Sequence, residues 1–153
     1  MDKIAKFEKV SNKEFADSEV VKLPVRATEG SAGYDICTPY AIHLEPGETI
    51  IVKTGLRCKI ENGWALFIMP KSGLGFKYRV QLDNTIGLID SDYYNADNEG
   101  HIMVKITNDG HEGKALDLEA GKAFVQGVFL PFGITVDDVC DGKRHGGFGS
   151  TNS

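Results

Sequence analysis

Apolar and polar residues alternate along most of this chain, which is the pattern of strands with one buried face. The alternating stretches are residues 7–10, 40–44, 50–52, 56–60, 78–82, 102–106 and 123–129. Residues 64–69 form an uninterrupted apolar run, which is typical of a strand buried on both faces. No stretch of a dozen residues repeats with the period of an amphipathic helix. The pattern predicts an all-β fold of about ten short strands, a jelly-roll-like β-sandwich.

Two local signals refine this pattern. Asn62-Gly63 lies between two apolar runs and predicts a hairpin turn, because both residues tolerate a positive φ. Ser72 follows Pro70-Lys71 and predicts the N-cap of one short helix, whose free N–H groups could receive an anion. An ordinary strand-to-turn connection is the alternative at Ser72.

Composition restricts the class of protein. The chain has 153 residues, of which 41% are hydrophobic and 25% charged, as expected for one globular domain. The net charge of −5 argues against direct binding of nucleic acid. The apolar runs are too short to span a membrane, and the N-terminus lacks the apolar stretch of a signal peptide.

Cysteine and histidine usage gives little sign of a metal site or of disulfides. The three cysteines are far apart and odd in number, which favours a reducing, cytoplasmic location. The four histidines show no metal-binding spacing, so zinc is not expected and each histidine is predicted to lie at the surface.

The last dozen residues differ from the rest of the chain. They are rich in glycine and cannot pack a core, so we expect a domain over 1–141 followed by a mobile arm over 142–153. A frayed tail is one interpretation. The other is a phosphate-binding loop, because glycine N–H groups, the Arg144 guanidinium and the hydroxyls of Ser150 and Thr151 all bind phosphate.

Carboxylates and one amide are the remaining candidates for chemistry. Asp90 and Asp92 would share one face of a strand, where one could act as a base on water, although paired aspartates also bind metals or flank turns. Asp35 lies two residues after Gly33 and could be a turn residue or a ligand of Mg²⁺. Gln126 interrupts an apolar strand, either as a hydrogen-bonded core amide or as a ligand contact.

Five segments become specific when they are taken together. They are residues 31–35, 70–74, 87–93, 121–126 and 144–151. In this order and spacing they resemble the five motifs of the trimeric deoxyuridine triphosphatases (dUTPases), from about residue 20 to the end of the chain.

The resemblance implies Mg²⁺-dependent hydrolysis of dUTP to dUMP and pyrophosphate, which limits uracil in DNA and supplies dUMP for thymidylate synthesis. Asp90 would activate the water that attacks the α-phosphorus, and Asp35 would reach the Mg²⁺ through water. The implied assembly is a homotrimer whose sites are shared between subunits.

The resemblance also implies where the substrate lies. A hairpin from Asn84 to Asp90, with the backbone near residues 102–103, would recognise uracil, and Tyr93 would stack under the deoxyribose and exclude a 2′-hydroxyl. Lys71, Ser72, Gly73 and Gln126 would hold the phosphate chain. Arg144, Ser150 and Thr151 would bind the γ-phosphate, while Phe148 would cover the uracil as the arm closes. The expected substrate-binding residues are Lys71, Ser72, Gly73, Asn84, Gly87, Leu88, Ile89, Tyr93, Ile102, Met103, Gln126, Arg144, Phe148, Gly149, Ser150 and Thr151.

Two departures from the family pattern leave alternatives open. Lys71 stands where the family usually has arginine, so one bidentate phosphate contact is lost. The segment 94–100 is longer than usual and is either a surface loop or a contact for another subunit or a regulatory partner. The rival functions are a dCTP deaminase of similar fold and a regulatory protein switched by nucleotide binding.

Overall fold

The computed structural model describes residues 1–147, so the predicted contacts of Phe148, Gly149, Ser150 and Thr151 lie outside the described residues. Strands predominate in this part of the chain, which confirms the all-β class and its single short α-helix. The strands are β1 (Ala5–Lys9), β2 (Val25–Arg26), β3 (Tyr34–Cys37), β4 (Ile42–Leu44), β5 (Thr49–Lys53), β6 (Leu56–Ile60), β7 (Trp64–Pro70), β8 (Val80–Leu82), β9 (Gly87–Ile89), β10 (Met103–Asn108), β11 (Leu116–Leu118) and β12 (Ala123–Pro131). The helices are η1 (Ser18–Val20), α1 (Ser72–Tyr78) and η2 (Ser91–Asn95).

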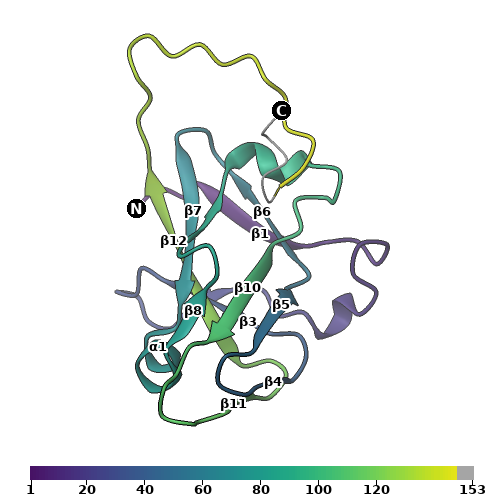
Figure 1. Cartoon of the computed structure of the whole chain (residues 1–153). Coiled ribbons are helices and arrows are strands. Elements are labelled where there is room, and N and C mark those ends of the chain that lie inside the picture. Colours follow the sequence, from purple (N-terminus) through teal and green to yellow (C-terminus); the bar gives the residue numbers. More distant parts are fainter. Residues whose placement is uncertain (148–153) are drawn as a thin grey trace.

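The strands form one large sheet and three smaller ones. The large sheet has the order β2-β3-β12-β7-β9, and a second sheet has the order β5-β10-β8. Two pairs, β1-β6 and β11-β4, complete the structure, and every pairing is antiparallel. Figure 1 shows β5, β8 and β10 beside the long β7–β12 pair. Buried side chains of both larger sheets, among them Ile68, Phe124, Val52 and Ile106, form a single core cluster.

The alternation predicted from the sequence is present in the strands. In β10, Val104 and Ile106 are buried and Lys105 between them is exposed. In β7, which lies between β12 and β9, both Ala65 and Leu66 are buried, as expected for a strand covered on two faces. Burial of these faces supplies the main favourable term for folding.

The predicted hairpin at Asn62-Gly63 is wrong. The chain does turn there, with Gly63 at a φ of +86° and the Trp64 N–H donating to the Glu61 carbonyl at 3.2 Å. However, β6 pairs with β1, and β7 pairs with β12 and β9. The turn therefore connects two sheets, because partners from distant parts of the sequence compete successfully with the local pairing.

The predicted helix exists, but its boundaries differ from the prediction. Helix α1 begins at Ser72, so Lys71 and not Ser72 is the N-cap, and no side chain caps the helix. Tyr78, which was expected to begin a strand, is the last helical residue. Arg79 ends the helix in the left-handed region, with a φ of +50°, and β8 begins at Val80.

All three cysteines, Cys37, Cys58 and Cys140, are free in the described part of the chain. Burial raises the pKa of the Cys58 thiol to about 12, which makes it an inert core side chain. No helix in residues 1–147 is both long and apolar enough to cross a membrane.

The prediction that all histidines lie at the surface is wrong for His101, which is fully buried. Its Nε2 accepts a hydrogen bond from the Gly55 N–H at 2.9 Å, and its Nδ1 lies 2.9 Å from a Glu14 carboxylate oxygen. Because Nε2 is an acceptor, Nδ1 must carry the proton and donate to Glu14. Its partners are distant in the sequence, which is why the local pattern did not reveal the burial.

His43 provides a test of the β4–β11 pairing. Its ring lies between the carboxylates of Asp117, at 2.6 Å, and Glu45, at 3.0 Å, and these hydrogen bonds raise the pKa of His43 above its ordinary value of 6.5. A raised folded-state pKa stabilises the protein below pH 6.5, and this contribution is lost as the pH rises through the folded-state pKa. We therefore expect the free energy of unfolding to fall less steeply above pH 6.5 in His43→Gln than in the unmodified protein.

Urea denaturation at several pH values would measure this difference. His111→Gln, at an exposed histidine in the loop before β11, is the matched control for the loss of one exposed imidazole. Equal pH slopes in His43→Gln and the unmodified protein would contradict the prediction.

Candidate active site

A cavity of about 500 Å³ lies between β8, β9 and β10 and collects much of the predicted site. Such a volume is in the range of small-molecule sites. The predicted residues that line it are Asn84, Gly87, Leu88, Ile89, Asp90, Tyr93, Met103 and Arg144. Ile102 does not line it, because this residue is fully buried and its backbone is bonded to Thr54 and Leu56.

The cavity opens because β8 and β9 separate. They flank the turn 83–86, but β8 pairs with β10 and β9 pairs with β7, so the expected uracil-binding hairpin is in fact a connection between sheets. Gly87 lies at the point of separation. A Cβ there would be 3.1 Å from the Cβ of Ile68 and 3.6 Å from a Leu82 methyl, so a side chain would crowd the core at this position.

Several residues of the cavity were not predicted. Apolar side chains from three neighbouring strands line it, namely Ile68, Leu82 and Val104. Asp83 and Lys105 also contribute and form an ion pair of 3.1 Å. The Thr107 hydroxyl donates to Asp83 at 2.6 Å, and this bond lowers the pKa of Asp83. Only the alternation along these strands could have indicated the apolar residues.

Asp90 and Asp92 lie at a junction and not along a strand, contrary to the prediction. Asp90 follows β9 as the N-cap of η2, and Asp92 is in the first turn of η2. Both carboxylates nevertheless reach one group. The Arg144 guanidinium donates from Nη2 to Asp90 and from Nε to Asp92, the latter at 2.7 Å.

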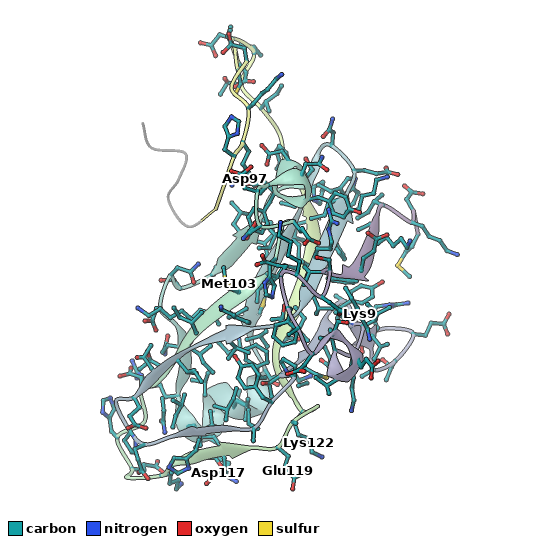
Figure 2. The ribbon with its side chains drawn as sticks, turned by 90° about the vertical axis from the view of Figure 1, so that its right-hand side faces the viewer. Lys9, Asp97, Met103, Asp117, Glu119 and Lys122 are labelled. Atoms are coloured by element: carbon teal, nitrogen blue, oxygen red, sulfur yellow. The ribbon has the colours of Figure 1, made fainter. Side chains whose placement is uncertain are left out.

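The C-terminal segment, as far as residue 147, returns to the cavity of its own chain. The Asp97 N–H donates to the His145 carbonyl at 3.0 Å, and Figure 2 shows Asp97 beside this segment, at the opposite end of the molecule from Asp117. A Cβ on Gly147 would lie 2.7 Å from the Tyr93 ring, so only glycine permits this approach. Arg144 is thus held at the cavity beside Asp90, and its predicted contact with the γ-phosphate stays a prediction.

Tyr93 contributes a buried aromatic ring to the cavity. It is 4% exposed, and burial raises the pKa of its phenol. The phenol is therefore neutral in the physiological range, and its hydroxyl both donates and accepts hydrogen bonds.

A second group of predicted residues lies away from the cavity. Lys71 and Asp35 form an ion pair of 2.7 Å, and Asp35 faces Gln126 across the β3–β12 pairing. The Gln126 amide donates to the Pro70 carbonyl at 3.2 Å. Ser72 and Gly73 are exposed at the start of α1, directly after Lys71. We call Asp35, Lys71, Ser72, Gly73 and Gln126 the phosphate cluster, after the phosphate and Mg²⁺ contacts that the sequence predicts for them.

The cavity and the phosphate cluster occupy opposite ends of β7. Ile89 pairs with Leu66 near the start of β7, whereas Lys71 follows Pro70 at its end. At about 3.3 Å per residue, Asp90 and Lys71 are on the order of 20 Å apart along this strand. Figure 1 shows α1, which begins after Lys71, and the C-terminal segment at opposite ends of the molecule.

Residues 1–147 contain no group of three or more histidine, cysteine, aspartate or glutamate residues placed to hold a metal ion. Asp35, the predicted contact for Mg²⁺, is a single carboxylate that is already paired with Lys71. One chain alone therefore offers at most one acidic ligand at the phosphate cluster.

Comparisons with known proteins identify the family. A family model described as dUTPase matches residues 19–152. A deoxyuridine 5′-triphosphate nucleotidohydrolase from Lactococcus lactis is 40% identical over 136 residues, which cover 87% of this chain and 89% of the relative. The crystal structure of a dUTPase from Streptococcus mutans has a TM-score of 0.71 at 34% identity and covers 86% of this chain and 98% of its own.

A more distant structure shares the fold. A mutant dUTPase from phage phi11 of S. aureus, whose structure describes the coordination of a structural Mg(II) ion, has a TM-score of 0.70 at 19% identity and covers 92% of this chain and 98% of its own. The match of the family model over most of the chain and the similarity to the Lactococcus protein lead to one conclusion. The chain belongs to the dUTPase family of hydrolases.

Proposed function

We propose that this chain hydrolyses dUTP to dUMP and pyrophosphate, with Asp90 as the catalytic base. The observation that carries the proposal is the position of Asp90 on a cavity that it shares with Tyr93, in a chain of the dUTPase family. In a cell this reaction would limit uracil in DNA and supply dUMP for thymidylate synthesis.

Uracil would enter between the turn 83–86 and β10. Asn84 and residues 86–89 line this space, and their backbone N–H and C=O groups would offer a fixed pattern of donors and acceptors. Cytosine presents the opposite pattern at its amino group and N3, so it would leave buried polar groups unpaired. Tyr93 would lie under the deoxyribose and leave no room for a 2′-hydroxyl.

The reaction needs one proton transfer. Asp90 would take a proton from a water molecule as the water oxygen attacks the α-phosphorus. The bond from this phosphorus to the bridging oxygen breaks, and pyrophosphate leaves with the bonding electron pair. Such a displacement depends mainly on positioning and neutralisation of charge. The Arg144 guanidinium is paired with Asp90 and Asp92. Incoming phosphates would compete for it and release Asp90 for water.

The phosphate cluster would complete the site from a second copy of the chain. A triphosphate is shorter than the separation of Asp90 and Lys71 along β7, so one chain cannot place both against one substrate. Residues 132–141 leave Ile134, Val136 and Val139 largely exposed, at 75%, 109% and 92%, as expected for a segment that packs on a neighbour. We propose the family's homotrimer, in which the sites lie between subunits.

Mg²⁺ fits this arrangement as an ion carried by the substrate. Mg²⁺ commonly binds through one or two carboxylates together with phosphate oxygens and water, so the single carboxylate of Asp35 is sufficient. When bound, the ion would neutralise charge on the phosphate oxygens. Lys71, which pairs with Asp35 at 2.7 Å, would hold that carboxylate in place.

Pyrophosphate release tests the proposal directly. We expect release from dUTP, and little from UTP, dCTP or dTTP, with Mg²⁺ present, and loss of the reaction when a chelator is added. Binding of dUTP without release of pyrophosphate would favour the regulatory function instead. Release of ammonia from dCTP would favour the deaminase.

A further inference from the structure

The long segment 94–100 is held by hydrogen bonds to the N-terminal segment and packs against Tyr93. The Glu99 carboxylate accepts hydrogen bonds from the Ser11 N–H, at 2.9 Å, and from the Ser11 hydroxyl. Glu99 and Gly100 both have a positive φ, of +62° and +71°. A Cβ on Gly100 would lie 2.6 Å from the Tyr93 carbonyl oxygen, so the segment packs directly against the Tyr93 backbone.

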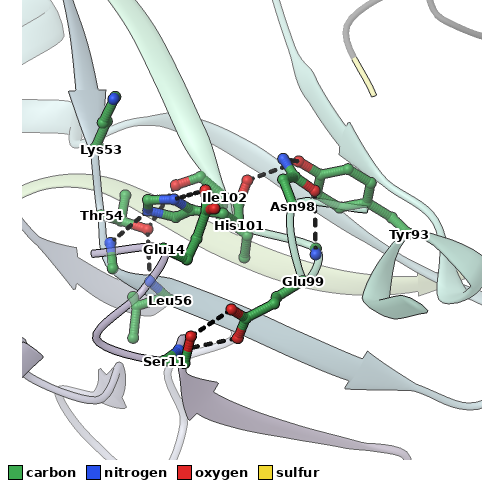
Figure 3. A network of polar contacts seen from close by, with 12 residues as sticks. Ser11, Glu14, Lys53, Thr54, Leu56, Tyr93, Asn98, Glu99, His101 and Ile102 are labelled. Carbon is green, nitrogen blue, oxygen red and sulfur yellow. Dashed lines mark hydrogen bonds and ion pairs between the residues drawn. The ribbon is translucent and has the colours of Figure 1, made fainter. Parts of the chain in front are cut away.

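This segment also holds the hydroxyl of Tyr93. The Asn98 amide donates to the Tyr93 Oη at 2.9 Å, and that hydroxyl in turn donates to the His101 carbonyl at 2.7 Å. Figure 3 shows Asn98 beside the tyrosine ring, with Glu99 reaching toward Ser11. The ring that lines the cavity is therefore fixed by two bonds at the end of its side chain.

The orientation of the Asn98 amide follows from its other contact. Its Oδ1 accepts a hydrogen bond from the Gly100 N–H at 3.2 Å. An amide turned the other way would direct two donors at each other, so Nδ2 must be the atom that faces Tyr93. Asn98 is the only side chain in the described residues that donates a hydrogen bond to this hydroxyl.

The acceptor of the tyrosine hydroxyl is equally well fixed. The His101 ring is buried between Glu14 and the Gly55 N–H, so the carbonyl of this residue has little freedom to move. The position of the Tyr93 ring is thus determined by residues from the N-terminal segment, from the connection before β6 and from the segment 94–100.

We propose that Asn98 is a positioning residue for substrate specificity. Its hydrogen bond to the Tyr93 hydroxyl sets how far the Tyr93 ring extends into the cavity, and hence the discrimination between dUTP and UTP. This inference rests on the proposed function of Tyr93 as the surface beneath the sugar. It assigns the segment 94–100 a role inside its own subunit. The contact of this segment with a regulatory protein stays a prediction.

The test is the ratio of kcat/KM for dUTP to kcat/KM for UTP. Asn98→Asp keeps the acceptor for the Gly100 N–H but cannot donate to Tyr93, so the ring is free to move and make room for a 2′-hydroxyl. The loss of one hydrogen bond corresponds to about a three- to tenfold fall in this ratio. A purely structural role would lower both kcat/KM values together and leave the ratio unchanged.

Asn95→Asp is the matched control, because it introduces the same charge at an exposed position of the same stretch. It should leave the ratio unchanged. Asn98→Ser, which introduces no charge, is a second variant and should lower the ratio in the same direction. Tyr93→Phe removes the hydroxyl itself. The double variant Tyr93→Phe/Asn98→Asp should therefore lower the ratio by no more than the single variant with the larger effect.

These measurements distinguish the proposed role of Asn98 from the proposed role of Tyr93. If Tyr93→Ala lowers the ratio and both Asn98 variants leave it unchanged, even with reduced thermal stability, the role of Asn98 is overturned and the role of Tyr93 stands. If Tyr93→Ala also leaves the ratio unchanged, the sugar is not recognised by Tyr93, and both are overturned. A fall in the ratio for Tyr93→Ala and for both Asn98 variants, with Asn95→Asp unchanged, supports the proposal.

Discussion

Replacing Asp90 with asparagine is expected to lower the turnover of dUTP by on the order of 10²- to 10⁴-fold, the range typical of a general base. Asparagine has nearly the same shape and can still accept a hydrogen bond from Arg144, so the cavity should keep its form. The amide cannot take the proton of the attacking water. Single-turnover release of pyrophosphate would measure the loss, and calorimetric titration with a non-hydrolysable dUTP analogue should show nearly unchanged binding.

Asp92→Asn is the control for this experiment. It removes the charge of the neighbouring carboxylate, which also binds Arg144, but leaves the proposed base intact. We expect less than about a tenfold effect, since one charged hydrogen bond is weakened and the proton acceptor remains. Undiminished turnover in Asp90→Asn would show that another group activates the water.

Removal of residues 144–153 is expected to lower kcat/KM for dUTP by on the order of 10²- to 10³-fold, while the assembly and its thermal stability change little. The truncation takes away the guanidinium beside Asp90 and the glycine that contacts Tyr93. Without them the cavity loses both the cation beside Asp90 and part of its cover against water. Steady-state kinetics together with sedimentation analysis would measure the two effects separately.

Arg144→Lys in the full-length chain tests the contribution of the guanidinium alone, because the rest of the segment is kept. Lysine keeps the charge but cannot reach two carboxylates with a planar fork, so we expect a smaller loss than that caused by truncation. If the truncated protein hydrolyses dUTP at the full rate, this segment has no part in the reaction.

The sequence predicted correctly those features of the structure that depend on residues close together in the chain. Alternation of side chains located β10 correctly, because one face of this strand packs on the core and the other faces solvent. The order of the motifs indicated that residues from Asn84 to Tyr93 belong to one site, and eight of the predicted residues line one cavity. These features depend on neighbours in the chain.

What the sequence could not show depends on distant partners. The connections at residues 61–63 and 83–86 look like hairpins locally, but their flanking strands pair with β1, β12 and β10. His101 is buried because Glu14 and Gly55 provide its polar contacts, and neither is near it in the sequence. The pairing of Arg144 with Asp90 likewise spans more than fifty residues.

In the proposed assembly, strand β7 would carry one part of an active site at each end, and this has a genetic consequence. A chain without Asp90 would inactivate only the site to which it contributes the cavity. A chain without Lys71 would inactivate only the site to which it contributes the phosphate cluster. Two alleles that are each inactive alone would therefore complement one another when their products assemble together. Selection would then act on the contacts between neighbouring copies as strongly as on the residues of either part of the site, since the proposed catalytic unit would be encoded by one gene but built from more than one molecule.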